Sequence, residues 1–309
     1  MDKTIDLHIK FHIRRGNMSI RIVIDSCCDL TQSYYEDNTD VFRLVTMPVE
    51  IDGIDFFDDF GKSMAPSDFY GRLREHIMPN TAQINQFRLK EIFEEEIKAG
   101  NEVIYLAFTS GMSGTYNNAL MARAEVLENY PEAIIGVVDT LAASVGEGVL
   151  AIHVLELVRK GMNFESIMQW VEENKIRSQH WFAVDDLVYL KHGGRVSAAT
   201  ATVGTVLNIK PILTLDGLGK IKNYTNVRGR KKSIHFLVEK LEANIVEPKE
   251  TILVIGHGDC EAEAQKLKET IESKYTLKAI HINPLSATIG SHVGPNMISL
   301  AFLGNKREF

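Results

Sequence analysis

One stretch of the chain, from Leu106 to Tyr116, gathers hydroxyl side chains and glycines between two apolar segments. The residues Glu102 to Phe108 form a compact apolar run typical of a buried strand, and apolar residues recur at helical spacing from Thr115 onward. A turn of this kind directs unpaired backbone N–H groups and the positive end of the helix towards one point. The stretch therefore predicts either a site for a small anion or a capped strand–helix turn without a ligand.

The residue pattern separates three kinds of anion site. No Lys-Ser or Lys-Thr pair closes the glycine pattern, which excludes a phosphate-binding P-loop. The segment Gly111-Met-Ser-Gly-Thr115 has threonine where the second glycine of a nucleophile elbow belongs, so serine catalysis is poorly supported. The third kind of site, for a carboxylate held by neutral donors, is compatible with these residues.

Composition narrows the class of protein. The chain has 309 residues, enough for one large or two ordinary domains, with 45% hydrophobic and 24% charged residues, as in soluble globular proteins. The most apolar run, Ala142 to Val158, contains Glu147, His153 and Glu156, so stable membrane insertion is not expected. A net charge of −7 argues against nucleic-acid binding.

The cysteines favour a reduced, cytoplasmic setting. There are three of them, and no pair has metal-ligand spacing: Cys27, Cys28 and Cys260. We therefore expect neither a disulfide framework nor a metal site.

Strand-like and helix-like segments alternate in the first half of the chain. The expected strands are Ile20 to Ile24, Val41 to Val49, Glu102 to Phe108 and Ala133 to Val138; the expected helices begin at Pro66, Gln86, Thr115 and Ala142. This order predicts a parallel sheet with helices on its faces and a ligand at the carboxyl ends of the strands. The acidic, aromatic segment from Gly53 to Gly61 is expected to be a surface loop. Close backbone packing would explain Gly146 and Gly148 inside a helix.

The second half indicates a mixed sheet. Residues 212–215 and 220–227 flank an Asp216-Gly217 turn and predict a hairpin, and residues 251–282 predict a further strand–helix–strand unit. We place an N-terminal extension at residues 1–18, an N-terminal α/β domain at 19–162 and a C-terminal α/β domain at 163–309. The fold class is therefore two-domain α/β, with a parallel first sheet and a mixed second sheet.

Six motifs in a fixed order resemble the DegV family of bacterial fatty-acid-binding proteins, which includes the carrier subunit of fatty acid kinase. The motifs are Asp25-Ser-Cys-Cys-Asp-Leu30, Thr81-Ala-Gln83, Thr109-Ser-Gly-Met-Ser-Gly-Thr-Tyr116, Tyr189-Leu-Lys-His-Gly-Gly-Arg-Val-Ser197, Lys210-Pro-Ile-Leu213 and Gly290-Ser-His-Val-Gly-Pro295. The resemblance implies a long-chain fatty acid between two α/β domains, no other cofactor, and a separate kinase as partner. Its carboxylate would lie on Thr81, Ser113 and His292. The chain departs from the family pattern at Ala82, Ile84, Met112 and Asn296.

A buried carboxylate needs several converging donors. We expect the hydroxyls of Thr81 and Ser113, the N–H of Gly114 and the imidazole of His292 to supply them. Neutral donors leave the carboxylate oxygens nucleophilic, which suits later attack on the γ-phosphate of ATP held by the kinase. Ser26 and Arg195 are possible supporting residues, with Arg195 expected to pair with an acidic residue such as Asp25 or Asp29.

One basic run has two interpretations: an ordinary solvated helix start, or a docking surface for an acidic kinase subunit. It consists of Arg228, Arg230, Lys231 and Lys232. Positive charge at a helix N-terminus opposes the macrodipole, which favours an acidic partner there.

Two alternatives to a carrier are open. An acyl-ester hydrolase would use Ser113 and His292 with Asp139 or Asp259, and a metal site would draw on His257, Asp259, His281 and His292. A regulatory protein with a vacant pocket is the other alternative.

Overall fold

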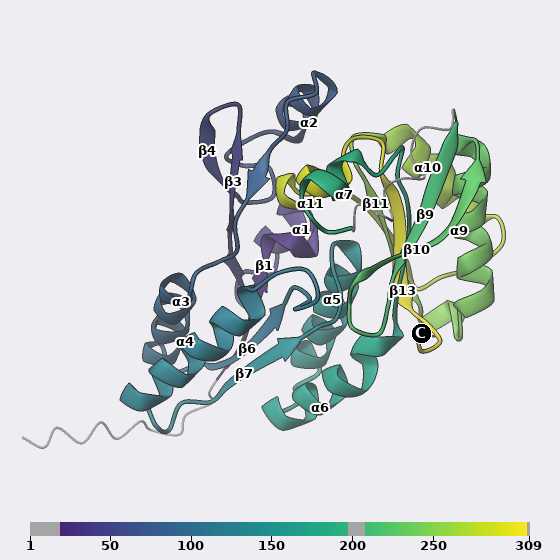
Figure 1. Ribbon diagram of the computed structural model, residues 1–309. Coiled ribbons are helices and arrows are strands. Elements are labelled where there is room, and N and C mark those ends of the chain that lie inside the picture. Colours follow the sequence, from purple (N-terminus) through teal and green to yellow (C-terminus); the bar gives the residue numbers. More distant parts are fainter. Residues whose placement is uncertain (1–18, 197–207, 308–309) are drawn as a thin grey trace, which may run out of the picture.

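The computed structural model describes residues 19–196 and 208–307. The predicted extension at residues 1–18 lies outside this part of the chain. Two halves, each built on its own sheet, lie side by side, with a long helix between them (Figure 1). The expectation of a two-domain α/β protein is confirmed.

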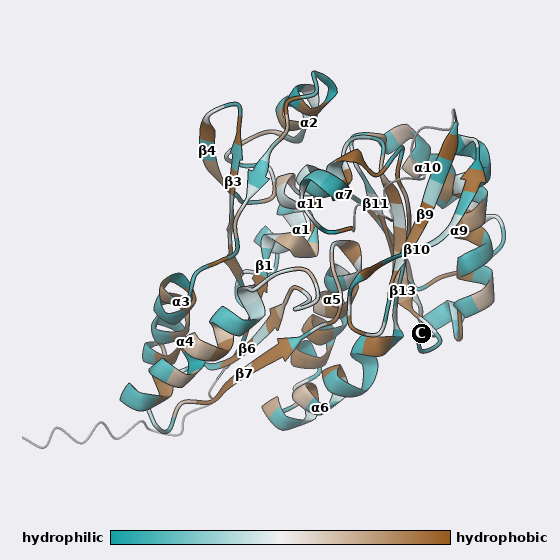
Figure 2. Cartoon of the chain, in the orientation of Figure 1, coloured by the Kyte–Doolittle hydropathy of each residue, from teal (hydrophilic) through white to brown (hydrophobic). Residues whose placement is uncertain are grey.

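The first half contains a four-stranded parallel sheet. Its strand order is β2 (Phe42–Val45), β1 (Ile20–Asp25), β6 (Glu102–Ala107) and β7 (Ile135–Asp139). The helices α3 (Gln86–Lys98) and α4 (Thr115–Asn129) pack together on this sheet, as do α5 (Val145–Arg159) and α6 (Phe164–Asn174). Because both faces are covered, the middle residues of β6 and β7 are apolar in succession rather than alternating with polar ones (Figure 2).

The second half contains a six-stranded mixed sheet, as expected. Its strand order is β10 (Ile221–Arg228), β9 (Ile209–Leu215), β8 (Ser178–Ala183), β13 (Ile298–Leu303), β11 (Ile252–His257) and β12 (Ala279–Pro284). The pair β11 and β12 is parallel, and the other neighbours are antiparallel. The helices α9 (Arg230–Asn244) and α10 (Glu261–Glu272) cover one face through Leu237, Leu241 and Leu267.

Short elements complete the described chain. They are η1 (Ser26–Cys28), α1 (Gln32–Glu36), η2 (Lys175–Arg177), α7 (Val188–His192), η3 (Pro248–Glu250) and α11 (Ala287–Val293). Across residues 19–196 and 208–307, no helix is long and apolar enough to cross a membrane.

The helix α5 packs against both sheets. It contacts β1 and η1 on one side and β8, β11 and β13 on the other. A Cβ on Gly148 would lie 2.4 Å from the backbone oxygen of Cys28, and one on Gly146 would lie 1.7 Å from Cε1 of His180. The two glycines therefore allow both halves to approach the helix backbone, which confirms the expected close packing.

The boundary between the domains stays a prediction. The helix α6 follows residue 162, yet its buried Ile167 and Val171 belong to the apolar core shared with the first sheet. It contacts β6 and β7.

The expectation of a surface loop from Gly53 to Gly61 is wrong. Residues Ile54–Asp58 form β4, which pairs antiparallel with β3 (Met47–Ile51), and β3 also pairs with β5 (Asn80–Thr81). The expected single strand from Val41 to Val49 is likewise two strands, β2 and β3. The turn between β3 and β4 is Asp52-Gly53, with φ of 56° and 71°, the backbone of a two-residue hairpin.

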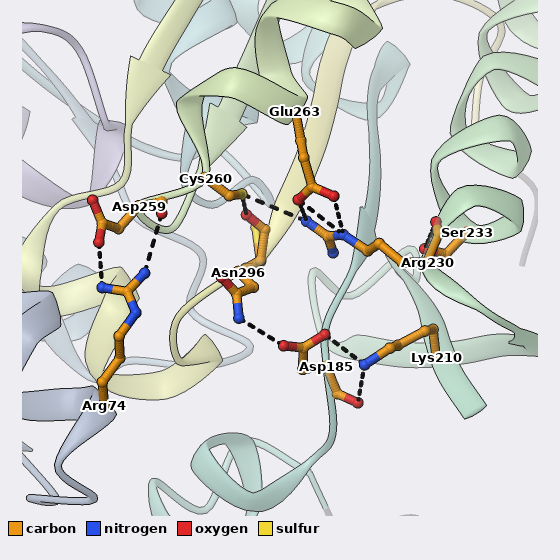
Figure 3. Close-up of polar contacts among 10 residues, drawn as sticks. Arg74, Asp185, Lys210, Arg230, Ser233, Asp259, Cys260, Glu263 and Asn296 are labelled. Atoms are coloured by element: carbon orange, nitrogen blue, oxygen red, sulfur yellow. Dashed lines mark hydrogen bonds and ion pairs between the residues drawn. The ribbon is translucent and has the colours of Figure 1, made fainter. Parts of the chain in front are cut away.

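The three-stranded sheet and α2 (Pro66–Arg74) reach over the second half of the chain. The hydroxyl of Tyr189 donates to the backbone oxygen of Leu73 at 2.8 Å. Arg74 donates to the carboxylate and the backbone oxygen of Asp259 (Figure 3). These contacts hold parts of the two halves together outside the sheets.

Two buried carboxyl groups also join the halves, at the N-terminus of α11. Asp29 accepts hydrogen bonds from the Ser286 N–H at 2.8 Å and from the Ser144 hydroxyl at 2.5 Å. Asp58 accepts from the N–H of Thr288 at 2.8 Å and from its hydroxyl at 2.6 Å. The helices expected from the sequence do not include α11.

Burial raises the pKa of both carboxyl groups against the opposing effect of these hydrogen bonds. The pKa of Asp29 rises from its ordinary value of 3.8 to about 7, and that of Asp58 to about 6. Between pH 4 and 7 the folded chain therefore holds a proton on Asp29 that the unfolded chain has lost. The stability that this proton contributes is complete below pH 4 and is lost as the pH rises through 7.

This linkage predicts the behaviour of Asp29→Asn, which can still accept from Ser286 but cannot titrate. As the pH rises from 4 to 7, the free energy of unfolding of the wild type should fall relative to that of the variant, by on the order of 4 kcal/mol. Urea unfolding at several pH values measures the difference. Asp40→Asn is the control, because Arg159 lowers the pKa of exposed Asp40 and its effect should be flat from pH 5 to 7. A pH-independent difference for Asp29→Asn would contradict the assignment.

A candidate ligand site between the two halves

A mostly apolar cavity lies between the two halves. Its volume is about 80 Å³, below the range of about 300 to 1,000 Å³ usual for small-molecule sites. Both halves supply its apolar wall, through residues that include Met47, Phe108, Met112, Phe182, Leu215 and Val293. The carboxyl ends of β1 and β6 lead into loops at this cavity, where the strand order predicts a ligand.

The predicted polar residues Thr81, Ser113 and His292 all line this cavity. Thr81 Oγ1 and His292 Nε2 lie 2.8 Å apart, although 211 positions separate the two residues in the chain. Thr81 ends the short strand β5 of the first half, and His292 lies in the last turn of α11 of the second half. The structure therefore brings residues from both halves to one polar group.

The imidazole of His292 is neutral at physiological pH. Burial lowers its pKa to about 4, and the charges of Arg195 and His192 lower it further. Its Nδ1 is buried without a hydrogen-bond partner among the described residues, since the ring lies against Gly193. A lone pair without a donor costs less than an N–H without an acceptor, so we place the proton on Nε2, where it donates to Thr81. The hydroxyl proton of Thr81 is then free to point at a ligand.

Ser113 is held by its neighbour in the turn. Its Oγ accepts from the Thr115 N–H at 3.2 Å and lies 3.0 Å from Thr115 Oγ1, which in turn accepts from the Ile84 N–H. With the Thr115 hydroxyl donating to Ser113, the Ser113 hydroxyl proton is also free. Both hydroxyl groups line the cavity, and each has a proton available for an acceptor there.

The expected cradle of free backbone N–H groups is largely wrong. Asp139 accepts from the Ser110 N–H, and Thr109 accepts from the N–H groups of Gly111, Met112 and Ser113. Within the described chain the N–H groups of Gly114, Tyr116 and Asn117 lack an acceptor, as the first N–H groups of a helix do. Gly114 is not part of the cavity wall, because the Gln83 amide lies over its Cα, where a Cβ would be 2.0 Å from Gln83 Oε1. Gln83 itself lines the cavity, although in the sequence it stands out only as part of the motif Thr81-Ala-Gln83.

The two supporting residues have other partners than expected. Arg195 lines the cavity but donates to the backbone oxygens of Met112 and Gly193, so the expected pairing with Asp25 or Asp29 is wrong. Those carboxyl groups are already satisfied by N–H and O–H donors. Ser26 is fully buried, and its Oγ accepts from the Met47 N–H at 3.0 Å. Its contact holds β3 against η1.

The basic run is divided by the fold. Arg230 turns inward and forms an ion pair with Glu263 at 2.7 Å, close to Cys260 (Figure 3). Arg228, Lys231 and Lys232 are exposed. Three of the four charges are therefore available to a partner.

The geometry does not assemble the alternative sites. Asp139 bonds to Ser110, and Asp259 pairs with Arg74, so neither carboxylate orients the imidazole of His292. In residues 19–196 and 208–307, no three His, Cys, Asp or Glu side chains are arranged to hold a metal ion.

Comparisons with known proteins agree with the motifs. The family model described as an uncharacterised protein of the DegV family matches residues 19–305. A DegV domain-containing protein of Clostridium perfringens is 42% identical over 287 residues, which cover 93% of this chain and 98% of that protein.

Solved structures are similar over almost the whole chain. A DegV lipid-binding protein from Thermotoga maritima has a TM-score of 0.82 at 28% identity and covers 94% of this chain and 100% of its own. A fatty-acid-binding DegV family protein from Thermus thermophilus has a TM-score of 0.81 at 28% identity and covers 93% and 100%. From the matched family model, the relative and the shared fold, the chain belongs to the DegV family.

Proposed function

We propose that the chain binds a long-chain fatty acid in the cavity between its halves. The acyl tail would lie among the apolar residues, which must move apart to admit it, and the carboxylate would accept hydrogen bonds from Thr81 and Ser113. The observation that carries this proposal is one mostly apolar cavity lined by both halves, with the contact between Thr81 and His292 in its wall. Similarity to structures that bind lipid and fatty acid supports it.

The hydrocarbon tail would supply the affinity. Burial of a methylene contributes about 0.8 kcal/mol, so ~15 methylenes contribute on the order of 12 kcal/mol before the costs of association. Loss of ligand freedom removes much of this, which leaves roughly micromolar to nanomolar binding. The head-group contacts then determine orientation.

The donors would keep the carboxylate reactive. The His292 imidazole is neutral, and Arg195 donates to backbone oxygens in place of forming a bidentate clamp. Two hydroxyl donors satisfy the carboxylate without neutralising its charge. We infer that this carrier presents the carboxylate to a separate cytoplasmic kinase, where one oxygen attacks the γ-phosphorus of ATP and ADP leaves.

The first prediction concerns the cargo. Protein purified from a bacterial host and extracted with organic solvent should release about one long-chain fatty acid per chain, because burial of the acyl tail against the apolar wall is favourable. Mass spectrometry of the extract measures the amount and the chain length. Extraction of an unrelated protein purified in parallel gives the background, and release at that background level would refute the carrier function.

The second prediction separates binding of the fatty acid from presentation of its carboxylate to the kinase. In Ser113→Ala and His292→Ala, fatty-acid affinity should change by less than about 5-fold, since the tail supplies most of it. Acyl phosphate formation by a fatty acid kinase should fall by about 10- to 100-fold, because the carboxylate loses its orientation. Ser110→Ala is the matched control, since its hydroxyl lies in the same turn but bonds to Asp139. Wild-type turnover in both test variants would show that the head-group assignment is wrong.

The third prediction concerns the kinase. Lys231→Glu/Lys232→Glu should lower kinase turnover in a salt-dependent manner if these exposed charges meet an acidic partner. Fatty-acid retention should not change, because neither residue lines the cavity. Lys249→Glu/Lys266→Glu makes the same charge change at exposed positions on other elements. Equal losses in the two double variants would argue against docking at the start of α9.

A further inference from the structure

The helix α11 belongs to the second half of the chain but is bonded to the first half at both ends. At its start, Asp29 accepts from the Ser286 N–H, and Asp58 accepts from Thr288. At its end, His292 meets Thr81. Asp29 and Asp58 come from different segments, the loop after η1 and the end of β4.

Thr288 and His292 are four residues apart, so they lie one turn apart on the same face of the helix. Both line the cavity. Asp58 takes the N–H and the hydroxyl of Thr288 together, at 2.8 and 2.6 Å, and these two bonds restrain both the rotation and the position of the first turn. Any movement of that turn is transmitted directly to the His292 ring.

The contact at His292 tolerates little movement. Its Nε2 lies 2.8 Å from Thr81 Oγ1, and a hydrogen bond is lost when this distance exceeds about 3.5 Å. On its other side the ring lies against Gly193, where a Cβ would be only 2.0 Å from Nδ1. The ring can therefore keep its hydrogen bond to Thr81 in only one position between the two halves.

We propose that Asp58, assisted by Asp29, is a positioning residue for the ligand head group: it anchors α11 on the first half and thereby sets the place of the His292 imidazole. Neither carboxyl group is in the cavity wall, so neither touches the ligand. That the positioned head group belongs to a fatty acid rests on the proposed function, whereas the anchoring of α11 does not.

The surroundings of the two carboxyl groups support a structural use of their hydrogen bonds. Both side chains are completely buried. The charged groups near them are other acids, among them Asp59 near Asp58. Within the described residues neither forms an ion pair, and the donors are the N–H and O–H groups of Ser144, Ser286 and Thr288. A carboxyl group at a helix start also interacts favourably with the helix dipole.

The test is the protonation of His292 in the ligand-free full chain, followed by NMR and assigned by loss of its signal in His292→Gln. At pH 5.5 the wild-type ring should be neutral, since burial holds its pKa at about 4. In Asp58→Ala the ring should leave its contact, become hydrated, and titrate near the ordinary value of 6.5. Asp58, with a pKa of about 6, is mostly protonated at pH 5.5, and loss of its charge at higher pH would by itself lower the pKa of a histidine, so a rise reports displacement of the ring.

Two further variants keep the test decisive. Asp58→Asn can still accept from the Thr288 N–H and should restore a neutral ring. Thr288→Val removes only the hydroxyl bond, preserves volume, and should give a smaller rise; it carries the test if Asp58→Ala does not fold. Leu267→Ala, in the distant core under α10, is the control for lost stability and should leave His292 neutral.

The outcomes separate this inference from the proposed function. A neutral His292 in Asp58→Ala, or in Thr288→Val should the former not fold, would overturn the inference, as would an equal rise in Leu267→Ala. Fatty-acid affinity should change by less than about 5-fold in Asp58→Ala, as in His292→Ala, because the tail supplies most of it. If wild-type protein binds no fatty acid while His292 still responds to Asp58→Ala, the proposed function fails and the anchoring stands.

Discussion

The helix α5 packs between the two sheets, and this packing determines how the halves are placed. Gly146 and Gly148 allow His180 of the second sheet and the backbone of Cys28 to approach the same helix. This close approach sets the separation of the halves, and with it the width of the cavity between them. The bonds from Asp29 and Asp58 to α11 then fix how the halves align along that surface. The cavity is thus a property of the interface, and neither half contains it alone.

The chemistry of the polar site follows from this burial. An interface that excludes water lowers the pKa of His292 and keeps its ring uncharged, while the hydroxyl groups of Thr81 and Ser113 have their oxygens occupied by protein donors. Their protons are left for a ligand. Such a site can orient an anion without forming an ion pair, and an apolar wall supplies the binding energy.

Local patterns predicted most elements, because buried parallel strands and capped helices leave clear runs and stops in a sequence. The Asp52-Gly53 hairpin was missed although its turn residues were visible, since the acidic, aromatic residues after it resemble a loop. The short helix α11 was missed although Ser286 caps it, and carboxyl groups distant in the chain bond to its first turn as well. Motif resemblance selected Thr81, Ser113 and His292, but the use of the loop N–H groups and the partners of Arg195 depend on tertiary contacts that no local pattern records.

The contact between Thr81 and His292 spans 211 positions of the chain. During synthesis on the ribosome, the first half can fold with its sheet complete while the wall supplied by the second sheet and α11 is still unmade. A nascent chain therefore has no closed cavity until α11 has emerged. Any ligand of this cavity can be enclosed only after that point, and fragments that end earlier lack one of its walls.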